Sequence, residues 1–154
     1  MSIEARDAVE RVWREQGDKL WRSLVAFTTD PDVATDAMAE AFAQALGRGA
    51  AVRDHDRWIW RASFRIAAGE LKARNRRSGE MPEPSYQMPE PVADLVRALA
   101  TLSPNQRAAI ALHEYADLST RDVARILGCS QATVRVHLAQ ARKRLRPLLE
   151  ETDD

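Results

Sequence analysis

The sequence predicts an all-α protein of two small helical domains joined by a proline-rich linker. Ala, Arg, Leu and Glu dominate, all good helix formers, and no segment alternates with the period of two that strands require. Residues 79–91 contain four prolines, which remove backbone donors and push their predecessors towards extended conformations. We therefore expect one domain over residues 1–78, a linker over 79–91 and a second domain over 92–154.

Three helices are expected in residues 1–78. The first spaces its apolar residues as a helix does and contains Gly17, a candidate break. These apolar residues are Val9, Val12, Trp13, Leu20 and Leu24. The second helix should begin at Asp30 and Pro31, a capping residue followed by proline at the first helical position, and end at 47–49. The third should run from about residue 56 to about residue 76.

This third helix interleaves aromatic and basic residues, the combination that holds single-stranded nucleic acid. Trp58 also belongs to an apolar stripe, and Trp60 with Phe64 would equally suit a contact between helices. The candidate DNA-binding residues of this segment are Arg53, Arg57, Trp58, Trp60, Arg61, Phe64 and Arg65.

In the second domain, a short helix precedes another that opens at Ser103, and residues 119–138 predict a helix-turn-helix. Ser119 can cap the first of its two helices, Gly128 can supply the positive φ that ends it, and Ser130 can cap the second. Small Ala124 and apolar Val134 fit two helices that cross closely. The alternative is a pair of packed helices in an ordinary bundle.

In the last predicted helix, apolar residues recur at helical spacing, which predicts a buried stripe along one side and an exposed face on the other. The stripe consists of Val134, Leu138, Ala141, Leu145 and Leu148. At the N-terminal end of the exposed face, arginine can pair with guanine and glutamine with adenine, whereas the later basic residues would contact phosphates or only water. The candidate DNA-binding residues are Ser130, Gln131, Ala132, Thr133, Arg135, Ala139, Arg142, Lys143 and Arg146.

Charge is segregated along the chain, although its 23 basic and 23 acidic residues cancel. Residues 1–47 carry a net −4, 48–80 carry +5, 81–91 carry −2, 92–149 carry +5 and 150–154 carry −4. The neutral total alone would argue against a polyanion-binding protein, but each basic block coincides with a candidate DNA-binding helix.

Other classes of protein are excluded by composition. No apolar run is long enough to cross a bilayer, no signal peptide begins the chain, and the single cysteine, Cys129, cannot form an internal disulfide. We expect a cytoplasmic protein without membrane insertion. No metal-ligand spacing, phosphate loop or nucleophile motif is present, so we expect no metal site, no cofactor and no enzymatic activity.

Several motifs together resemble a known family. Residues 102–107, the pair 118–119 with the helix-turn-helix, and residues 141–146 resemble region 4 of bacterial sigma factors. Asp30-Pro31-Asp32 leading to Asp36 and 41–42, followed by 57–61, resembles their region 2. Two such domains with a linker are the layout of the extracytoplasmic-function (ECF, group 4) sigma factors.

The resemblance implies a protein that binds RNA polymerase core and directs promoter recognition and melting. Region 2 of the family binds the β′ clamp helices and captures the −10 element, while region 4 reads the −35 element and touches the β-flap. Asp36, Glu40 and Phe42 match the clamp-binding helix, and Trp58 and Arg61 match the start of the promoter-melting helix. The family also implies an anti-sigma factor as a partner.

Two departures keep alternatives open. Ala39 stands where the family often has glutamine, and Arg65 stands where it often has asparagine. The chain could instead be a stand-alone helix-turn-helix regulator with a dimerising N-terminal domain, or a sigma-like interaction module without promoter activity.

Overall fold

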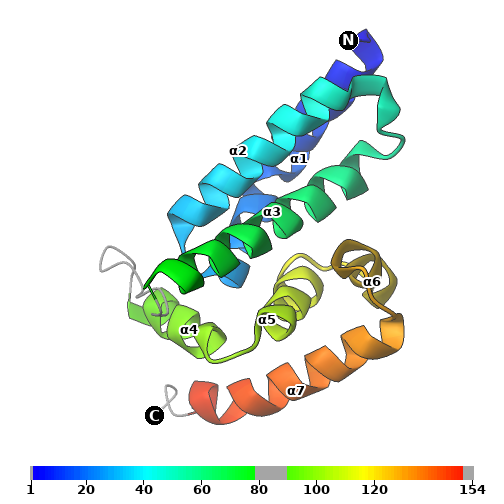
Figure 1. Ribbon diagram of the computed structural model, residues 1–154. Coiled ribbons are helices and arrows are strands. Elements are labelled where there is room, and N and C mark those ends of the chain that lie inside the picture. The colour runs from blue at the N-terminus through cyan, green and yellow to red at the C-terminus, as the bar shows by residue number, and fades with distance from the viewer. Residues whose placement is uncertain (1, 79–89, 151–154) are drawn as a thin grey trace.

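The computed structural model describes residues 2–78 and 90–150, and every element in these ranges is helical (Figure 1). This confirms the predicted all-α class. The 11 residues 79–89 of the predicted linker lie outside the described residues, and its last two residues open α4. The elements are α1 (Ile3–Thr28), α2 (Pro31–Arg48), a 3₁₀ turn (Gly49–Ala51), α3 (His55–Ser78), α4 (Glu90–Ala100), α5 (Pro104–Ile110), a π-helical turn (Ala111–Tyr115), α6 (Thr120–Leu127) and α7 (Gln131–Glu150).

Helices α1, α2 and α3 pack against one another in pairs. The expected break at Gly17 is wrong, because α1 continues through this residue for 26 residues. Gly17 is buried instead, and a Cβ atom at this position would lie 3.5 Å from Met38 Cε of α2. That separation is an ordinary van der Waals contact, so the space would admit a Cβ atom, and the packing of α1 against α2 sustains the helix through Gly17 despite the low helix propensity of glycine.

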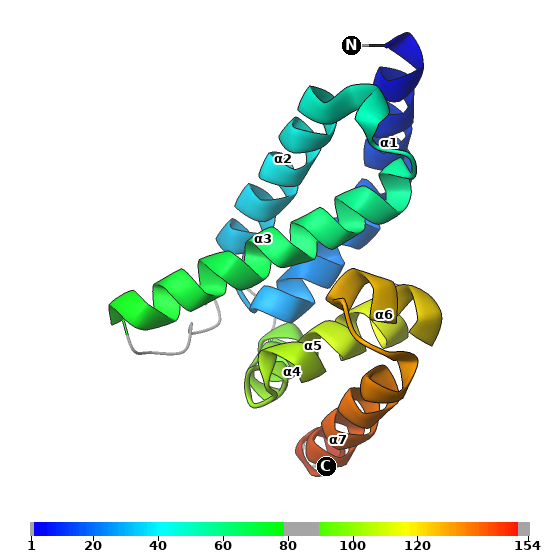
Figure 2. The ribbon, with the colours of Figure 1, turned by 45° about the vertical axis from the view of Figure 1, so that its right-hand side comes forward.

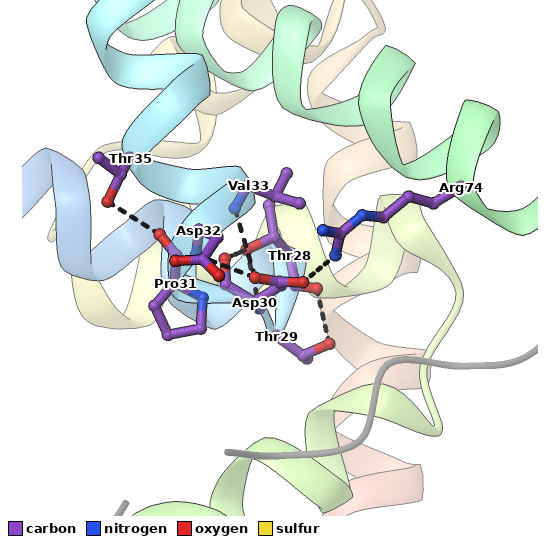
Figure 3. A network of polar contacts seen from close by, with 8 residues as sticks. All are labelled: Thr28, Thr29, Asp30, Pro31, Asp32, Val33, Thr35 and Arg74. Carbon is purple, nitrogen blue, oxygen red and sulfur yellow. Dashed lines mark hydrogen bonds and ion pairs between the residues drawn. The ribbon is translucent and has the colours of Figure 1, made fainter. Parts of the chain in front are cut away.

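The turn between α1 and α2 is fixed by polar contacts (Figure 3). Asp30 Oδ1 accepts hydrogen bonds from the backbone N–H groups of Asp32 and Val33, at 2.9 and 3.3 Å, which confirms the predicted cap. The other carboxylate oxygen of Asp30 pairs with Arg74 of α3. One aspartate thus orients α2 and also ties the C-terminal part of α3 to the turn.

The helix-turn-helix forms as the sequence predicts. Ser119 Oγ accepts the backbone N–H of Asp122 at 3.1 Å, and Ser130 Oγ accepts that of Thr133 at 3.1 Å. Gly128 ends α6 with φ +72°, and its N–H bonds to the carbonyl of Ala124. Both helices of the motif are therefore capped by the residues that the spacing indicated.

The two halves of the molecule share one apolar core. Helix α6 lies against α3, while α4, α5 and the π-helical turn lie against α1 (Figures 1 and 2). Buried residues of α1 and α3 join those of α5 and α6 in a continuous cluster, and α4 and α7 enclose a smaller one. The helix-turn-helix is consequently held against the first three helices.

A buried arginine joins the two halves. Arg107 of α5 is only 7% exposed, and its Nε donates to the carbonyl of Phe27 in α1 at 2.7 Å. Its Nη1 donates to the carbonyl of Leu102 at 2.9 Å, and its guanidinium lies 5.9 Å from the Phe27 ring centre. Burial lowers the pKa of Arg107. The carbonyl of Phe27 is one of the helix-end acceptors that α1 itself cannot satisfy.

Replacing Arg107 by methionine should destabilise the protein by about 2–4 kcal/mol, because two buried carbonyls lose their donor. Urea unfolding followed by circular dichroism measures this difference. The matched control is Arg97→Met, which removes an exposed arginine that pairs with Asp94, three residues earlier on the same helix. This substitution should change stability by less than about 1 kcal/mol. Equal effects of the two substitutions would contradict this role of Arg107.

Gly128→Ala should cost about 1–2 kcal/mol, because alanine at positive φ is strained even where its Cβ meets nothing within 4 Å. Gly69→Ala is the control: Gly69 lies inside α3 and its Cβ would also meet nothing within 4 Å. There alanine should raise stability by up to about 1 kcal/mol. Thermal unfolding of both variants checks these opposite signs, and a stabilising Gly128→Ala would refute the αL cap.

Candidate nucleic-acid interface

Helix α7 has a buried apolar side and an exposed side, as the sequence predicts. Val134, Leu138, Ala141 and Leu145 are buried, and Leu148 is partly buried. All nine predicted DNA-binding residues of the motif, from Ser130 to Arg146, are exposed. The exposed face of α7 is therefore available to a ligand along its described length.

Side-chain hydrogen bonds engage four of these nine residues, and two of the four, Ser130 and Thr133, share a bond between their hydroxyl groups at 2.9 Å. Ser130 caps α7, Gln131 Oε1 accepts from the Thr120 hydroxyl at 3.2 Å, and Arg142 Nε bonds to Glu114 at 2.9 Å. The Thr120 contact orients Gln131 at the junction of α6 and α7. Glu114 holds the Arg142 guanidinium against the π-helical turn. Arg142 would have to leave this carboxylate before it could contact a phosphate.

Val136 is an exposed apolar residue of α7 that the sequence reasoning missed. It is 52% exposed and lies one turn after Ala132, on the face that carries the predicted residues. Apolar side chains at such positions contact the methyl group of thymine. The signal was available, since Val136 falls between two members of the buried stripe, Val134 and Leu138.

The basic residues of the α3 segment are accessible. Arg53, Arg57, Arg61 and Arg65 are exposed and follow one another at intervals of four residues. Trp58 is half-buried, and the guanidinium of Arg48 lies 5.4 Å from its ring centre. The segment thus presents a row of positive charge beside one partly exposed indole.

Trp60 and Phe64 of α3 are buried. Trp60 Nε1 donates to Gln16 Oε1 at 2.8 Å, and its ring is stacked on that of Phe64 with centres 6.4 Å apart. Phe64 stacks in turn on Phe27, with centres 5.3 Å apart. The sequence left open whether Trp60 and Phe64 stack on DNA or pack against another helix. In the structure both pack against α1, and neither ring offers a free face to a base.

A groove runs between α3 and the helix-turn-helix. Arg57, Trp58 and Arg61 line one wall, and Asp122 and Arg125 of α6 line the other. Arg57 Nη2 lies 3.6 Å from Asp122 Oδ1, so an ion pair crosses the groove. The helix-turn-helix therefore neutralises one of the arginines that the sequence assigns to DNA.

On α2, Asp36 and Glu40 are exposed, as the polymerase-binding prediction requires. Phe42 is buried, and its ring forms a T-shaped pair with that of Trp13 of α1, at a centre distance of 4.9 Å and an interplanar angle of 86°. Trp13, one of the apolar residues named for the first predicted helix, is 55% exposed. It follows Val12 directly and so lies off the buried stripe, which is the signal that the sequence reasoning overlooked.

Metal-ligand groups, the single cysteine and the apolar length of the helices can be assessed in residues 2–78 and 90–150. No group of His, Cys, Asp and Glu side chains in these ranges is arranged to hold a metal ion. Burial raises the pKa of the Cys129 thiol, which disfavours the reactive thiolate. None of the helices in these ranges is both long and apolar enough to span a membrane.

Comparisons with known proteins agree with this arrangement. The family described as Sigma-70, region 4 matches residues 93–145. The RNA polymerase sigma-E factor of Streptomyces antibioticus is 30% identical over 158 residues, which cover 94% of this chain and 86% of that protein. The ECF RNA polymerase sigma factor SigM of Mycobacterium tuberculosis is also 30% identical, over 94% of this chain and 78% of its own length.

A solved structure shares the fold. The sigma factor RpoE from Bartonella quintana, in complex with the anti-sigma factor NepR, superimposes with a TM-score of 0.72 at 23% identity, over 85% of this chain and 89% of that chain. Sigma factors are generally non-enzymatic regulators of RNA polymerase. The two relatives, each 30% identical over 94% of this chain, together with the match to region 4, show that the chain belongs to the extracytoplasmic-function sigma factors, which direct transcription initiation.

Proposed function

We propose that this sigma factor, of the group 4 layout, binds RNA polymerase core through the outer side of α2 and reads promoter DNA with α7 and α3. The observation that carries the proposal is the exposed face of α7, where Gln131 and Arg135 stand beside a buried apolar stripe. A helix held in this way can enter a major groove with its N-terminal residues at the base edges.

The −35 contact is assigned to α7. Arg135 is exposed and can pair bidentately with guanine, and Gln131 can pair with adenine. Ser130 and Thr133 lie at the helix N-terminus, where hydroxyl and backbone donors suit a phosphate. Lys143 and Arg146, about three and four turns after Gln131, would supply charge without sequence selectivity. Ala132 and Ala139 would leave room for close approach, and Val136 could contact a thymine methyl group.

The −10 contact is assigned to α3. Arg53, Arg57, Arg61 and Arg65 would track the backbone of a single strand, and Trp58 would supply a stacking surface. Trp60 and Phe64 support α3 from beneath. Because Arg57 pairs with Asp122, the strand would gain full access to this row only when α6 moves away from α3.

The partners follow from the family. RNA polymerase core, through its β′ clamp helices and β-flap, and promoter DNA are the proposed ligands, and an anti-sigma factor is the proposed regulator. The solved relative in complex with NepR supports the last assignment by analogy. The proposed place of action is the cytoplasm, and the proposed role needs neither a cofactor nor a metal ion.

Promoter-dependent transcription with purified core polymerase tests the proposal. Addition of the protein should yield transcripts from a subset of a promoter library, and Arg135→Ala should reduce discrimination at one −35 base pair by roughly 5- to 150-fold, the equivalent of ~1–3 kcal/mol. The control is Arg6→Ala on α1, which removes the same charge from an exposed position beside Glu10 and should leave selectivity unchanged.

Two outcomes would reject the proposal. If core polymerase with the protein gave no more promoter-dependent transcripts than core alone, but the protein bound an inverted repeat by itself, the chain would be a stand-alone regulator. If it joined core polymerase, gave no promoter-dependent transcripts, and Arg135→Ala changed nothing, it would be an interaction module.

A further inference from the structure

A cavity of about 520 Å³ lies between the two halves of the molecule. Its walls come from the end of α1, from α3, from the N-terminal part of α5 and from the end of α6. It shares only Ile126 with the lining of the groove that the Arg57–Asp122 pair crosses. Small organic ligands bind in cavities of about 300–1,000 Å³, commonly where two structural units meet. The size and position of this cavity therefore suit a small molecule.

The inner wall of the cavity is apolar. The stacked rings of Phe27 and Phe64 line it together with three buried aliphatic side chains, those of Leu71, Ala108 and Ile126. A ligand surface placed against such a wall is removed from water, which favours an apolar or aromatic body. The shape of the wall, built from two aromatic rings, suits a flat ring system.

Every charged side chain that lines the cavity is basic. Arg65 and Lys72 of α3 are exposed and form part of its rim, whereas Arg107 of α5 is buried. No carboxylate of the described residues lines the cavity. Positive charge that is not neutralised locally, beside an apolar wall of low dielectric constant, attracts an anion.

Arg107 has one nitrogen left for a ligand. Its Nε and Nη1 donate to the carbonyls of Phe27 and Leu102, whereas its Nη2 has no hydrogen-bond partner within the part of the chain that the structure describes. Nη2 is also not among the polar atoms that the protein encloses completely, so a ligand in the cavity can reach it. Because the residue is only 7% exposed, an anion there would meet a donor that water reaches poorly.

We propose that this cavity binds a small organic anion, with an aromatic or similarly apolar body and one carboxylate. The body would lie against the apolar wall that includes Phe64, and the carboxylate would accept a hydrogen bond from Arg107. Lys72 and Arg65 would add positive charge at the rim. The inference goes beyond the proposed function, because it concerns the free protein without polymerase or DNA.

The site is complete only while the two halves are docked. Helix α3 contributes Phe64 and Lys72, and α5 contributes Arg107. A ligand that binds one arrangement of a protein better than another shifts the population towards the first. Occupation of the cavity should therefore stabilise the packed arrangement and oppose any movement of α6 away from α3.

Calorimetric titration of the full chain with naphthalene-2-carboxylate tests the proposal, and naphthalene-2-carboxamide is the neutral probe of matching shape. The carboxylate should bind a single site at least about tenfold more tightly than the carboxamide, because hydrogen bonds between arginine and an anion are stronger than those to a neutral amide. Lys72→Gln should weaken binding of the carboxylate several-fold and leave that of the carboxamide unchanged. Lys19→Gln is the control, since Lys19 is exposed on α1 and outside the cavity.

Gly69 offers a way to fill the cavity without harming α3. It lines the cavity, and a Cβ atom at this position would meet nothing within 4 Å. Gly69→Leu should occupy part of the space and weaken both probes at least about tenfold, while leucine favours the helix more than glycine does. Gly69→Ala, with a much smaller side chain, should keep most of the affinity. Saturating carboxylate should raise the midpoint of thermal unfolding of the unsubstituted protein more than that of Gly69→Leu.

Three results would overturn this inference. The first is the lack of saturable binding of the carboxylate, and the second is equal affinity for the two probes. The third is binding of the carboxylate that survives both Lys72→Gln and Gly69→Leu in folded protein, because the anion would then lie elsewhere on the basic surface.

Discussion

The arrangement of the whole molecule depends on the buried guanidinium of Arg107. A buried charge is tolerated only where hydrogen bonds replace water, and Arg107 finds them at the carbonyls of Phe27 and Leu102. These two acceptors come from the end of α1 and from the turn before α5, so the two halves must meet there. The Phe27 ring that faces the guanidinium also stacks on Phe64 of α3. The position of α3 is therefore linked to the same contact.

Docking of the two halves gives the binding surfaces different accessibility. The outer side of α2 and the exposed face of α7 are open, whereas Trp60 and Phe64 of α3 are buried and Arg57 is paired with Asp122 across the groove. Under the proposed function, a protein with this arrangement could bind polymerase and duplex DNA before the proposed surface for single-stranded DNA on α3 becomes accessible. The Arg57–Asp122 pair joins two segments, 48–80 and 92–149, that each carry a net charge of +5.

Local features were predictable from the sequence, and contacts between distant segments were not. The caps at Asp30, Ser119 and Ser130, and the αL position of Gly128, follow from residues within three or four positions, and the structure has all of them. Arg107 reaches Phe27 over 80 positions, a distance at which periodicity carries no information. For the same reason the packing of Phe42 against Trp13 and of Met38 beside Gly17 was found only in the structure.

The two halves of the free protein form one packed body. Distance measurement between two spin labels tests it most directly, with the single cysteine Cys129 replaced by serine and labels attached at exposed positions 43 on α2 and 139 on α7. We predict one narrow distance distribution for the free protein, because the shared core fixes α7 relative to α2. A broad distribution, such as two domains on a flexible tether would give, would contradict the account.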